Sequence, residues 1–294
     1  MIFSNNYLCG LFKCLDKSML KKQPLFLVNV EKVLKTKAPQ ASRKVPKFVI
    51  KWLEYLICQD GLNDFLRKNN GAEGVDFMKN AVEYFNITVR LEGEENVPQT
   101  NQRFIFASNH PLGGLDGICL SAILGTQYDG KIKYLVNDIL YSLEPLKTVF
   151  VPINKHGAQA KGGAEAINQA FSSENQIITF PAGLCSRKQK EMIEDLEWKK
   201  MFIVKAVEYK RDVIPVYFEA KNSTFFYRLA NIRKFLGIKF NMEMLFLPRE
   251  MFKSKGSIFT IRFGQPIPWE IFDSSKTPAV WAQQVKEMVY KLKK

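Results

Sequence analysis

The stretch FIFASNHPLGGLDGICLSAIL, residues 104–124, joins two apolar segments through a short polar loop. Residues 104–109 have the composition of a buried strand, and residues 117–125 have the spacing of a helix. His110 follows the strand directly, and Asp116 stands where the helix is expected to begin. A buried strand or a plain surface turn needs neither side chain, so this loop is the first candidate for a functional site.

Short β-rich segments alternate with helical segments on both sides of this loop. Helices are predicted over residues 117–125, 160–173 and 198–210. Strands that alternate with crossover helices indicate an α/β domain with a largely parallel central sheet flanked by helices. Ligands of such sheets bind at the carboxyl ends of strands, which is where His110 stands. The predicted strands cover residues 87–93, 104–109, 132–137, 148–154, 176–183, 212–220 and 258–267.

The N-terminal part of the chain does not show this alternation of strands and helices. Residues 35–47 read as a polar linker that contains proline, and helices are predicted over residues 48–69, with a break near Gly61, and over residues 74–85. We therefore expect a basic arm and helical extension over residues 1–86, followed by the α/β domain over residues 87–294.

Composition excludes several classes of protein. Of the 294 residues, 46% are apolar, which is enough for one large packed core. The five cysteines are scattered and there are two histidines, so neither a disulfide framework nor a zinc site is expected. No apolar run approaches the ~18 residues of a spanning helix, and the N-terminus lacks the features of a signal peptide. The sequence predicts a cytoplasmic protein that can rest on a membrane.

The net charge of +14 is unevenly distributed. Residues 1–50 hold ten Lys and Arg against two acidic residues, and a second basic region runs from residue 187 to 262. Such charge suits an anionic partner, either a nucleic acid or the anionic surface of a membrane. No nucleic-acid-binding module accompanies it, which favours the membrane. Residues 1–25 and 225–240 mix apolar and basic side chains and are the candidate interfacial segments, although a dimer or a partner helix would explain them equally well.

His110 and Asp116 together suit base catalysis. A neutral imidazole can take a proton from a hydroxyl, and a carboxylate on its other nitrogen fixes the tautomer and stabilises the imidazolium that forms. The chain has no G-x-S-x-G elbow, so the nucleophile would be the hydroxyl of the substrate itself; the thiol of Cys185 is the less favoured alternative. The plainer interpretation is that Asp116 is only the N-cap of a helix and His110 a loop residue.

The segment SNHPLGGLDG, residues 108–117, resembles the first motif of the glycerolipid acyltransferases, the lysophosphatidic-acid acyltransferase-like superfamily. That motif has four residues between its His and its Asp, whereas five separate His110 from Asp116. The longer form NHP-x-GGLDG is similar to the bacterial hemolysin-like and ornithine- and glycine-lipid O-acyltransferases. The resemblance implies that His110 and Asp116 are catalytic and that Asn109, Gly113 and Gly114 contribute to substrate binding.

Two later segments resemble further motifs of the superfamily. FPAGLCSRK, residues 180–188, is similar to the third motif, with Phe180, Pro181, Gly183 and Ser186 matching and Ala182 replacing a glutamate. VFVPIN, residues 149–154, stands where the second motif ends in an arginine; Ile153 lies near that position, and Lys155 is the candidate substitute.

Gly183 and Arg187 are candidates on chemical grounds as well. A glycine lets the backbone approach a ligand closely, and the N–H groups around Gly183 are suited to an oxyanion. A guanidinium suits a phosphate or carboxylate headgroup, which makes Arg187 the first candidate for that contact.

The resemblance implies a specific reaction. A fatty acyl group would move from a thioester of acyl carrier protein or coenzyme A to the hydroxyl of a lyso-lipid, on the inner face of the cell membrane, without a metal or bound cofactor. Ala182 and Ile153 favour a lyso-aminolipid, an ornithine or glycine lipid, as the acceptor. The alternatives are acylation of lysophosphatidic acid in phospholipid synthesis and a non-catalytic lipid-binding scaffold.

Overall fold

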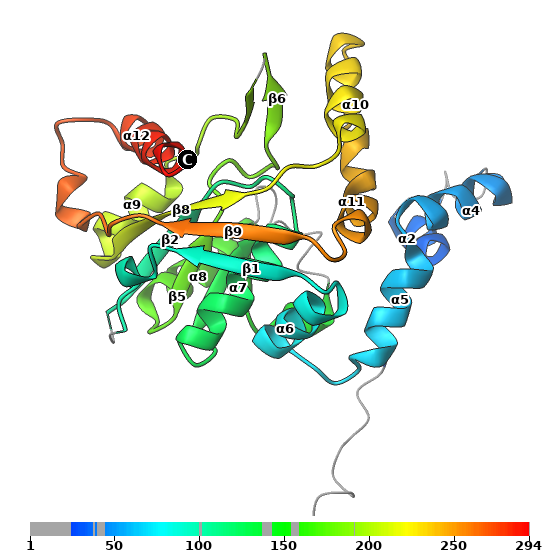
Figure 1. Ribbon diagram of the computed structural model, residues 1–294, viewed down its shortest axis with the longest axis horizontal. Coiled ribbons are helices and arrows are strands. Elements are labelled where there is room, and N and C mark those ends of the chain that lie inside the picture. The colour runs from blue at the N-terminus through cyan, green and yellow to red at the C-terminus, as the bar shows by residue number, and fades with distance from the viewer. Residues whose placement is uncertain are drawn as a thin grey trace, which may run out of the picture.

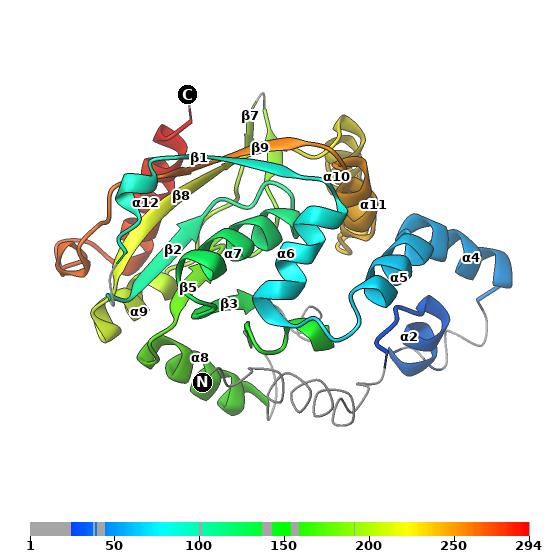
Figure 2. The same cartoon turned by 60° about the horizontal axis from the view of Figure 1, so that its bottom comes forward.

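A computed structural model of the protein describes residues 25–37, 39, 45–99, 102–136, 143–153, 159–190 and 192–293. Its centre is a seven-stranded sheet of order β1-β9-β8-β2-β5-β3-β4 (Figure 1). The chain between the strands forms helices that cover both faces of the sheet (Figure 2). The strands are β1 (Thr88–Glu92), β2 (Phe104–Ser108), β3 (Ile132–Val136), β4 (Phe150–Pro152), β5 (Gln176–Thr179), β8 (Asp212–Glu219) and β9 (Ile258–Phe263).

The sheet is largely parallel, as predicted. Strands β8, β2, β5, β3 and β4 run in one direction, because each neighbouring pair among them is parallel. The direction changes once, between β8 and β9, and β1 then pairs parallel with β9. The carboxyl ends of β2, β5, β3 and β4 therefore meet at one edge of the sheet, and the loops after β2 and β5 lie side by side there.

Two hydrophobic layers hold the sheet, one on each face. On one face Phe104 and Phe106 of β2 pack in the same cluster as helices α6 (Gly74–Tyr84) and α7 (Leu115–Gln127). On the other face Ile105 and Ala107 pack with α8 (Gln159–Ser172), α9 (Met201–Tyr209) and α12 (Pro278–Lys291). Successive side chains of a strand point to opposite faces, so a strand buried on both sides is a continuous apolar run. This explains the segment FIFAS.

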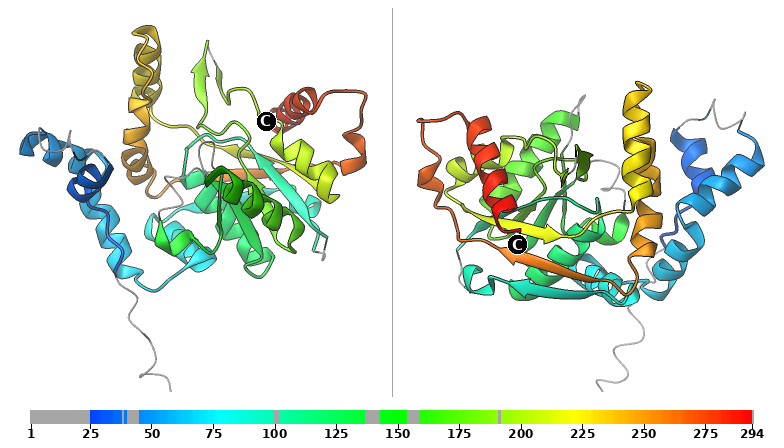
Figure 3. Two further views of the ribbon diagram at one scale, coloured as in Figure 1. Left: turned by 180° about the vertical axis from the view of Figure 1, so that it is seen from behind. Right: turned by 45° about the horizontal axis from the view of Figure 1, so that its top comes forward.

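The N-terminal extension consists of α2 (Val30–Lys37), α4 (Lys47–Leu56) and α5 (Gln59–Lys68). It lies beside α10 (Thr224–Phe235) and α11 (Leu247–Lys253) (Figures 1 and 3). Phe65 of α5 and Phe77 of α6 belong to the same hydrophobic cluster as the strands. The boundary predicted between residues 86 and 87 therefore falls within one shared core.

The break predicted near Gly61 occurs earlier. The backbone turns at Cys58, which has a left-handed φ of 53°, and Gly61 lies inside α5. A Cβ at Gly61 would stand 2.6 Å from the ring of Phe252 in α11, so the glycine permits close packing and does not end a helix. Among the described residues, no helix is both long and apolar enough to span a bilayer.

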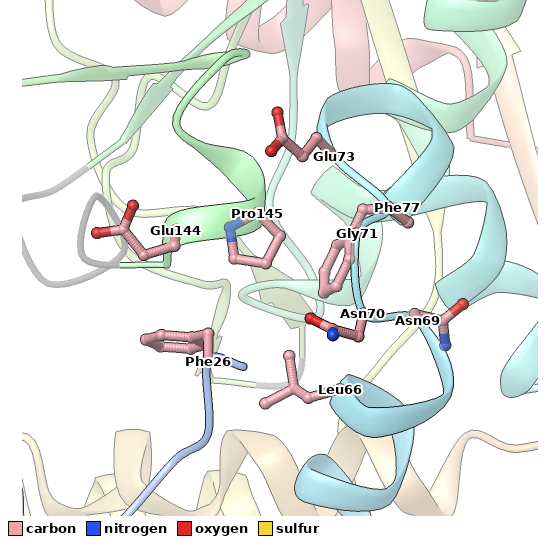
Figure 4. A pocket seen from close by; sticks show the side chains of 10 residues that line it. Phe26, Leu66, Asn69, Asn70, Gly71, Glu73, Phe77, Glu144 and Pro145 are labelled. Carbon is pink, nitrogen blue, oxygen red and sulfur yellow. The ribbon is translucent and has the colours of Figure 1, made fainter. Parts of the chain in front are cut away.

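A small hollow lies where the extension meets the domain. Figure 4 shows Phe26 and Leu66 facing Phe77 and Pro145 across it, beside the turn between α5 and α6. Its volume of about 30 Å³ is room for roughly one water molecule. It therefore offers no space for a substrate.

Candidate active site

The loop after β2 places His110 at the carboxyl edge of the sheet. The His110 carbonyl accepts a hydrogen bond from the Ser186 N–H at 2.7 Å, and its own N–H donates to the Asp195 carboxylate at 3.1 Å. The loop then turns at Gly113, whose φ of +75° favours glycine. A Cβ at Gly113 would stand 2.9 Å from the Leu247 side chain and 3.1 Å from the Cys185 Cβ, so a side chain at this position would crowd both neighbours.

His110 and Asp116 form a direct pair. The His110 Nδ1 atom lies 3.0 Å from the Asp116 Oδ2 atom, and the Asp116 side chain is fully buried. The same carboxylate accepts backbone N–H bonds from Leu112 at 2.9 Å, Gly114 at 3.0 Å and Gly117 at 2.9 Å. Asp116 is not the N-cap of α7, as one interpretation had it: Gly114 is the N-cap, and Asp116 lies inside the first turn. The carboxylate instead holds the loop in place through these backbone hydrogen bonds and orients the imidazole.

The charge balance of this pair favours an ionised Asp116. Although burial opposes ionisation, the adjacent His110 and the backbone donors Leu112 and Gly117 lower the pKa of Asp116 overall. Burial likewise disfavours the imidazolium, but the Asp116 carboxylate, helped by Asp195, raises the pKa of His110 above its ordinary value of 6.5. An ionised carboxylate can only accept, so the proton lies on Nδ1, and Nε2 remains the nitrogen that can take a proton.

The loop after β5 forms the other side of the site. The ring of Phe180 lies against the His110 imidazole, with centroids 4.3 Å apart, and also contacts the Tyr134 ring, with centroids 5.3 Å apart. Gly183 has a φ of +68°, and its N–H donates to the Phe180 carbonyl at 2.9 Å. This N–H closes the turn, so the predicted binding of an oxyanion around Gly183 would use N–H groups of its neighbours and stays a prediction.

A cavity of about 180 Å³ opens beside His110. Its walls are mainly apolar, and the lining residues with polar side chains are Thr179, Lys199 and Tyr134, besides His110. An apolar pocket with a base at its side can hold an acyl chain while the hydroxyl of a second substrate loses its proton. The lining residues are His110, Tyr134, Leu135, Val136, Ile153, Thr179, Phe180, Pro181, Gly183, Lys199, Met201 and Phe202.

Arg187 does not contact the cavity, contrary to its predicted headgroup role. It is buried in the short β6 strand (Arg187–Gln189), where its guanidinium donates to the Glu243 carboxylate and to the Cys185 carbonyl, both at 2.9 Å. Glu243 is fully buried and also pairs with Arg233 at 2.9 Å. The charge of Arg187 is thus balanced inside the protein. The sequence could not indicate this, because Glu243 is 56 residues away.

Asn109 and Ser186 hold the loops together. The Asn109 side chain is buried and exchanges two hydrogen bonds with the backbone of Phe218, at 2.6 and 3.0 Å, which fastens the end of β2 to β8. The Ser186 hydroxyl donates to Asp195 at 2.6 Å. Gly114 contributes its N–H to Asp116. Lys155 lies outside the described residues.

Cys185 is unsuited to nucleophilic attack. Its side chain is fully buried, and burial raises the pKa of the thiol to about 11. The thiolate is the reactive form of cysteine, so the thiol at neutral pH is inert. Among the described residues, no cluster of His, Cys, Asp and Glu could hold a metal ion.

Comparison with known proteins shows the family of the chain. A family model described as "Acyltransferase" matches residues 32–294. The chain belongs to the acyltransferase family. The match begins well before residue 87, so it includes the segment of α4, α5 and α6 as well as the α/β domain.

Individual relatives are similar over nearly the whole chain. A lyso-glycine lipid O-acyltransferase from Bacteroides thetaiotaomicron is 52% identical over 268 residues, which cover 91% of this chain and 98% of that protein. A protein of the same name from Phocaeicola vulgatus is 50% identical, over 91% of this chain and 96% of its own. Among solved structures, the 1-acyl-sn-glycerophosphate (LPA) acyltransferase PlsC from Thermotoga maritima is 20% identical with a TM-score of 0.48, over 74% of this chain and 78% of its own.

Proposed function

We propose that the protein transfers a fatty acyl group from a thioester, of acyl carrier protein or of coenzyme A, to the hydroxyl of a lyso-aminolipid, with lyso-glycine lipid as the acceptor. The observation that carries the proposal is the His110–Asp116 pair at the side of an apolar cavity. The names of the relatives, at 52% and 50% identity, support glycine lipid over other acceptors.

The reaction follows from the orientation of the imidazole. His110 Nε2 takes the proton of the acceptor hydroxyl as its oxygen attacks the thioester carbonyl carbon, and Asp116 stabilises the imidazolium that forms. The carbon–sulfur bond then breaks, and the leaving thiolate takes the proton back from His110. The products are an ester and a free thiol, so His110 is regenerated and no metal or bound cofactor takes part.

A competition between acceptors tests the choice of substrate. Equal concentrations of lyso-glycine lipid, lyso-ornithine lipid and lysophosphatidic acid would be offered to the purified protein with one acyl thioester, and the esters would be separated by mass. We expect the ester of lyso-glycine lipid to dominate. Preferential acylation of lysophosphatidic acid would agree with acyl transfer but contradict lyso-glycine lipid as the acceptor. The absence of any ester would favour a lipid-binding scaffold.

Lys199 replaces Arg187 as the candidate headgroup contact, because Lys199 lines the cavity and Arg187 does not. Lys199→Gln should raise the KM for the carboxylate-bearing lyso-glycine lipid by about tenfold, the effect of one charged hydrogen bond, with a smaller change in kcat. Steady-state rates at varied acceptor concentration measure this. Lys200→Gln, one position along the chain, is the matched control, and an equal rise in KM in both variants would contradict a specific contact.

The tip of α10 is the proposed membrane contact. Phe235 is 89% exposed and Leu236 61% exposed, and the basic side chains of Lys234 and Lys239 are exposed beside them. Figures 1 and 3 show α10 extending beyond the sheet, so these side chains are free to reach a surface. Apolar and basic side chains together suit the interface of an anionic bilayer. The protein would thus act on the inner face of the cell membrane; residues 1–24 of the predicted basic arm lie outside the described residues.

Removing the apolar tip should weaken membrane binding. Phe235→Ser with Leu236→Ser should reduce binding to vesicles containing anionic lipid by at least about tenfold, since burying one such side chain contributes about 1.5–3 kcal/mol. Co-sedimentation with vesicles measures the change. Val280→Ser, an exposed apolar residue of α12, is the control. Unchanged vesicle binding together with a loss of dimers on gel filtration would assign the tip to a protein interface instead.

A further inference from the structure

Asp195 is a buried carboxylate that the reaction described above does not use. It follows the short hairpin of β6 and β7 (Met192–Glu194), and its side chain is fully buried. Oδ1 accepts the His110 N–H at 3.1 Å and the Ser186 hydroxyl at 2.6 Å, and Oδ2 accepts the Trp198 indole N–H at 2.9 Å. One carboxylate thus accepts three hydrogen bonds, which is more than the stabilisation of a turn requires.

The backbone of His110 is held on both sides by this arrangement. Asp195 binds its N–H, and the Ser186 N–H binds its carbonyl at 2.7 Å, while the Ser186 hydroxyl returns to Asp195. The three residues form a closed ring of hydrogen bonds that fixes the peptide from which the imidazole projects. Asp116 orients the imidazole itself, so the two carboxylates fix His110 at two different points.

The main chain of Asp195 is anchored as well. Its N–H donates to the Tyr290 hydroxyl at 2.6 Å, and its carbonyl accepts the Lys286 ammonium at 2.7 Å, both from α12. The carboxylate is therefore tied to a helix of the core, and small shifts of the β6–β7 hairpin need not move it. Burial raises the pKa of Asp195, while its three hydrogen-bond donors act in the opposite direction and favour the ionised carboxylate. In its ionised form Asp195 favours the protonated form of His110.

We propose that Asp195 is a positioning residue for the general base: it fixes the His110 backbone and its charge stabilises the imidazolium during acyl transfer. This rests on the proposed function, since it assigns Asp195 a part in the same reaction. It predicts an effect on turnover and on His110 protonation, and not on the affinity for either substrate.

The test is Asp195→Asn, which keeps the shape of the side chain and removes its charge. We expect kcat to fall by about 10- to 100-fold with little change in either KM, because the imidazolium that forms in the transition state loses a stabilising charge, whereas substrate binding does not depend on that charge. We also expect the His110 pKa, followed by NMR with labelled histidine, to fall. The chain has only two histidines, which makes the spectrum simple.

Trp198→Phe is the matched control. It removes one donor from the same carboxylate and leaves the charge and the bonds to His110 and Ser186 in place. It should lower the melting temperature without lowering the His110 pKa. The inference is overturned if Asp195→Asn leaves both kcat and the His110 pKa unchanged, or if Trp198→Phe reproduces both effects.

One further measurement tests the inference if the variant does not fold. If Asp195→Asn does not fold, hydrogen exchange of the wild-type His110 amide decides: protection supports the bond to Asp195, and exchange at the rate of an exposed amide refutes it. The NMR titration needs no turnover. A wild-type protein that transfers no acyl group would therefore contradict the proposed function. A His110 pKa that is the same in the wild type and in Asp195→Asn would contradict this inference alone.

Discussion

His110→Ala should lower kcat for acyl transfer by about 10³-fold, within the range that general acid–base catalysis supplies. Without the imidazole, no group described here takes the proton from the acceptor hydroxyl as it attacks the thioester. Stability should change little, because Asp116 keeps its backbone donors Leu112, Gly114 and Gly117 after the imidazole is removed. Single-turnover rates with saturating acceptor measure the chemical step apart from product release.

His156→Ala is the control for His110→Ala, since it removes the other histidine of the chain. It should leave the rate of acyl transfer unchanged. Vesicle binding and melting temperature of His110→Ala should match the wild type, which separates a loss of chemistry from a loss of folding or docking. A His110→Ala variant with more than a tenth of the wild-type rate would end the general-base assignment.

Asp116→Asn should have the second largest effect, with kcat lowered by about 10²- to 10³-fold. An amide in this place can offer its NH2 group where the carboxylate offered an acceptor, so the imidazole is no longer held with its proton on Nδ1. Removing the negative charge also lowers the His110 pKa, because Asp116 is the group that raises it. The neutral base then persists to lower pH, so the acidic limb of the pH–rate profile should move to lower pH while its plateau falls.

This variant also disturbs the loop, and the control must separate the two effects. Both Asp116 oxygens accept backbone N–H groups, so the amide leaves at least one buried donor unpaired, at about 1–3 kcal/mol each. Gly113→Ala strains the same loop at a φ of +75° and leaves the charge in place. It should lower stability and rate without moving the acidic limb. A limb that moves equally in both variants would contradict the electrostatic role of Asp116.

The fold was predictable because its signals are local. Each strand of the main sheet falls within a predicted apolar run. The loop after β2 is recognisable as a candidate site because a histidine and an aspartate follow the end of such a run. The same short range explains the errors. The alternative interpretation of Asp116 as a helix cap used only its position before the helix, which is what the sequence shows. The backbone donors that surround Asp116 appear only when the loop folds.

The partners of the site come from far along the chain and leave no local pattern. Asp195 is 85 residues from His110, among the acidic neighbours Glu194 and Glu197, and nothing in the sequence distinguishes it from them. Arg187 was expected at a headgroup because an isolated arginine suits an anion, but Glu243 meets it in the interior. Such pairings depend on how segments distant in the chain fold against one another, which periodicity does not encode.

The most direct test of the account is mass-spectrometric detection of the O-acylated product from purified protein, acyl thioester and lyso-glycine lipid, with His110→Ala run in parallel. Donors would be the thioesters of acyl carrier protein and of coenzyme A. We expect the ester and one equivalent of free thiol with at least one donor in the wild type, and their formation about 10³-fold more slowly in His110→Ala. Equal ester from both proteins, or none from either donor, would contradict the account.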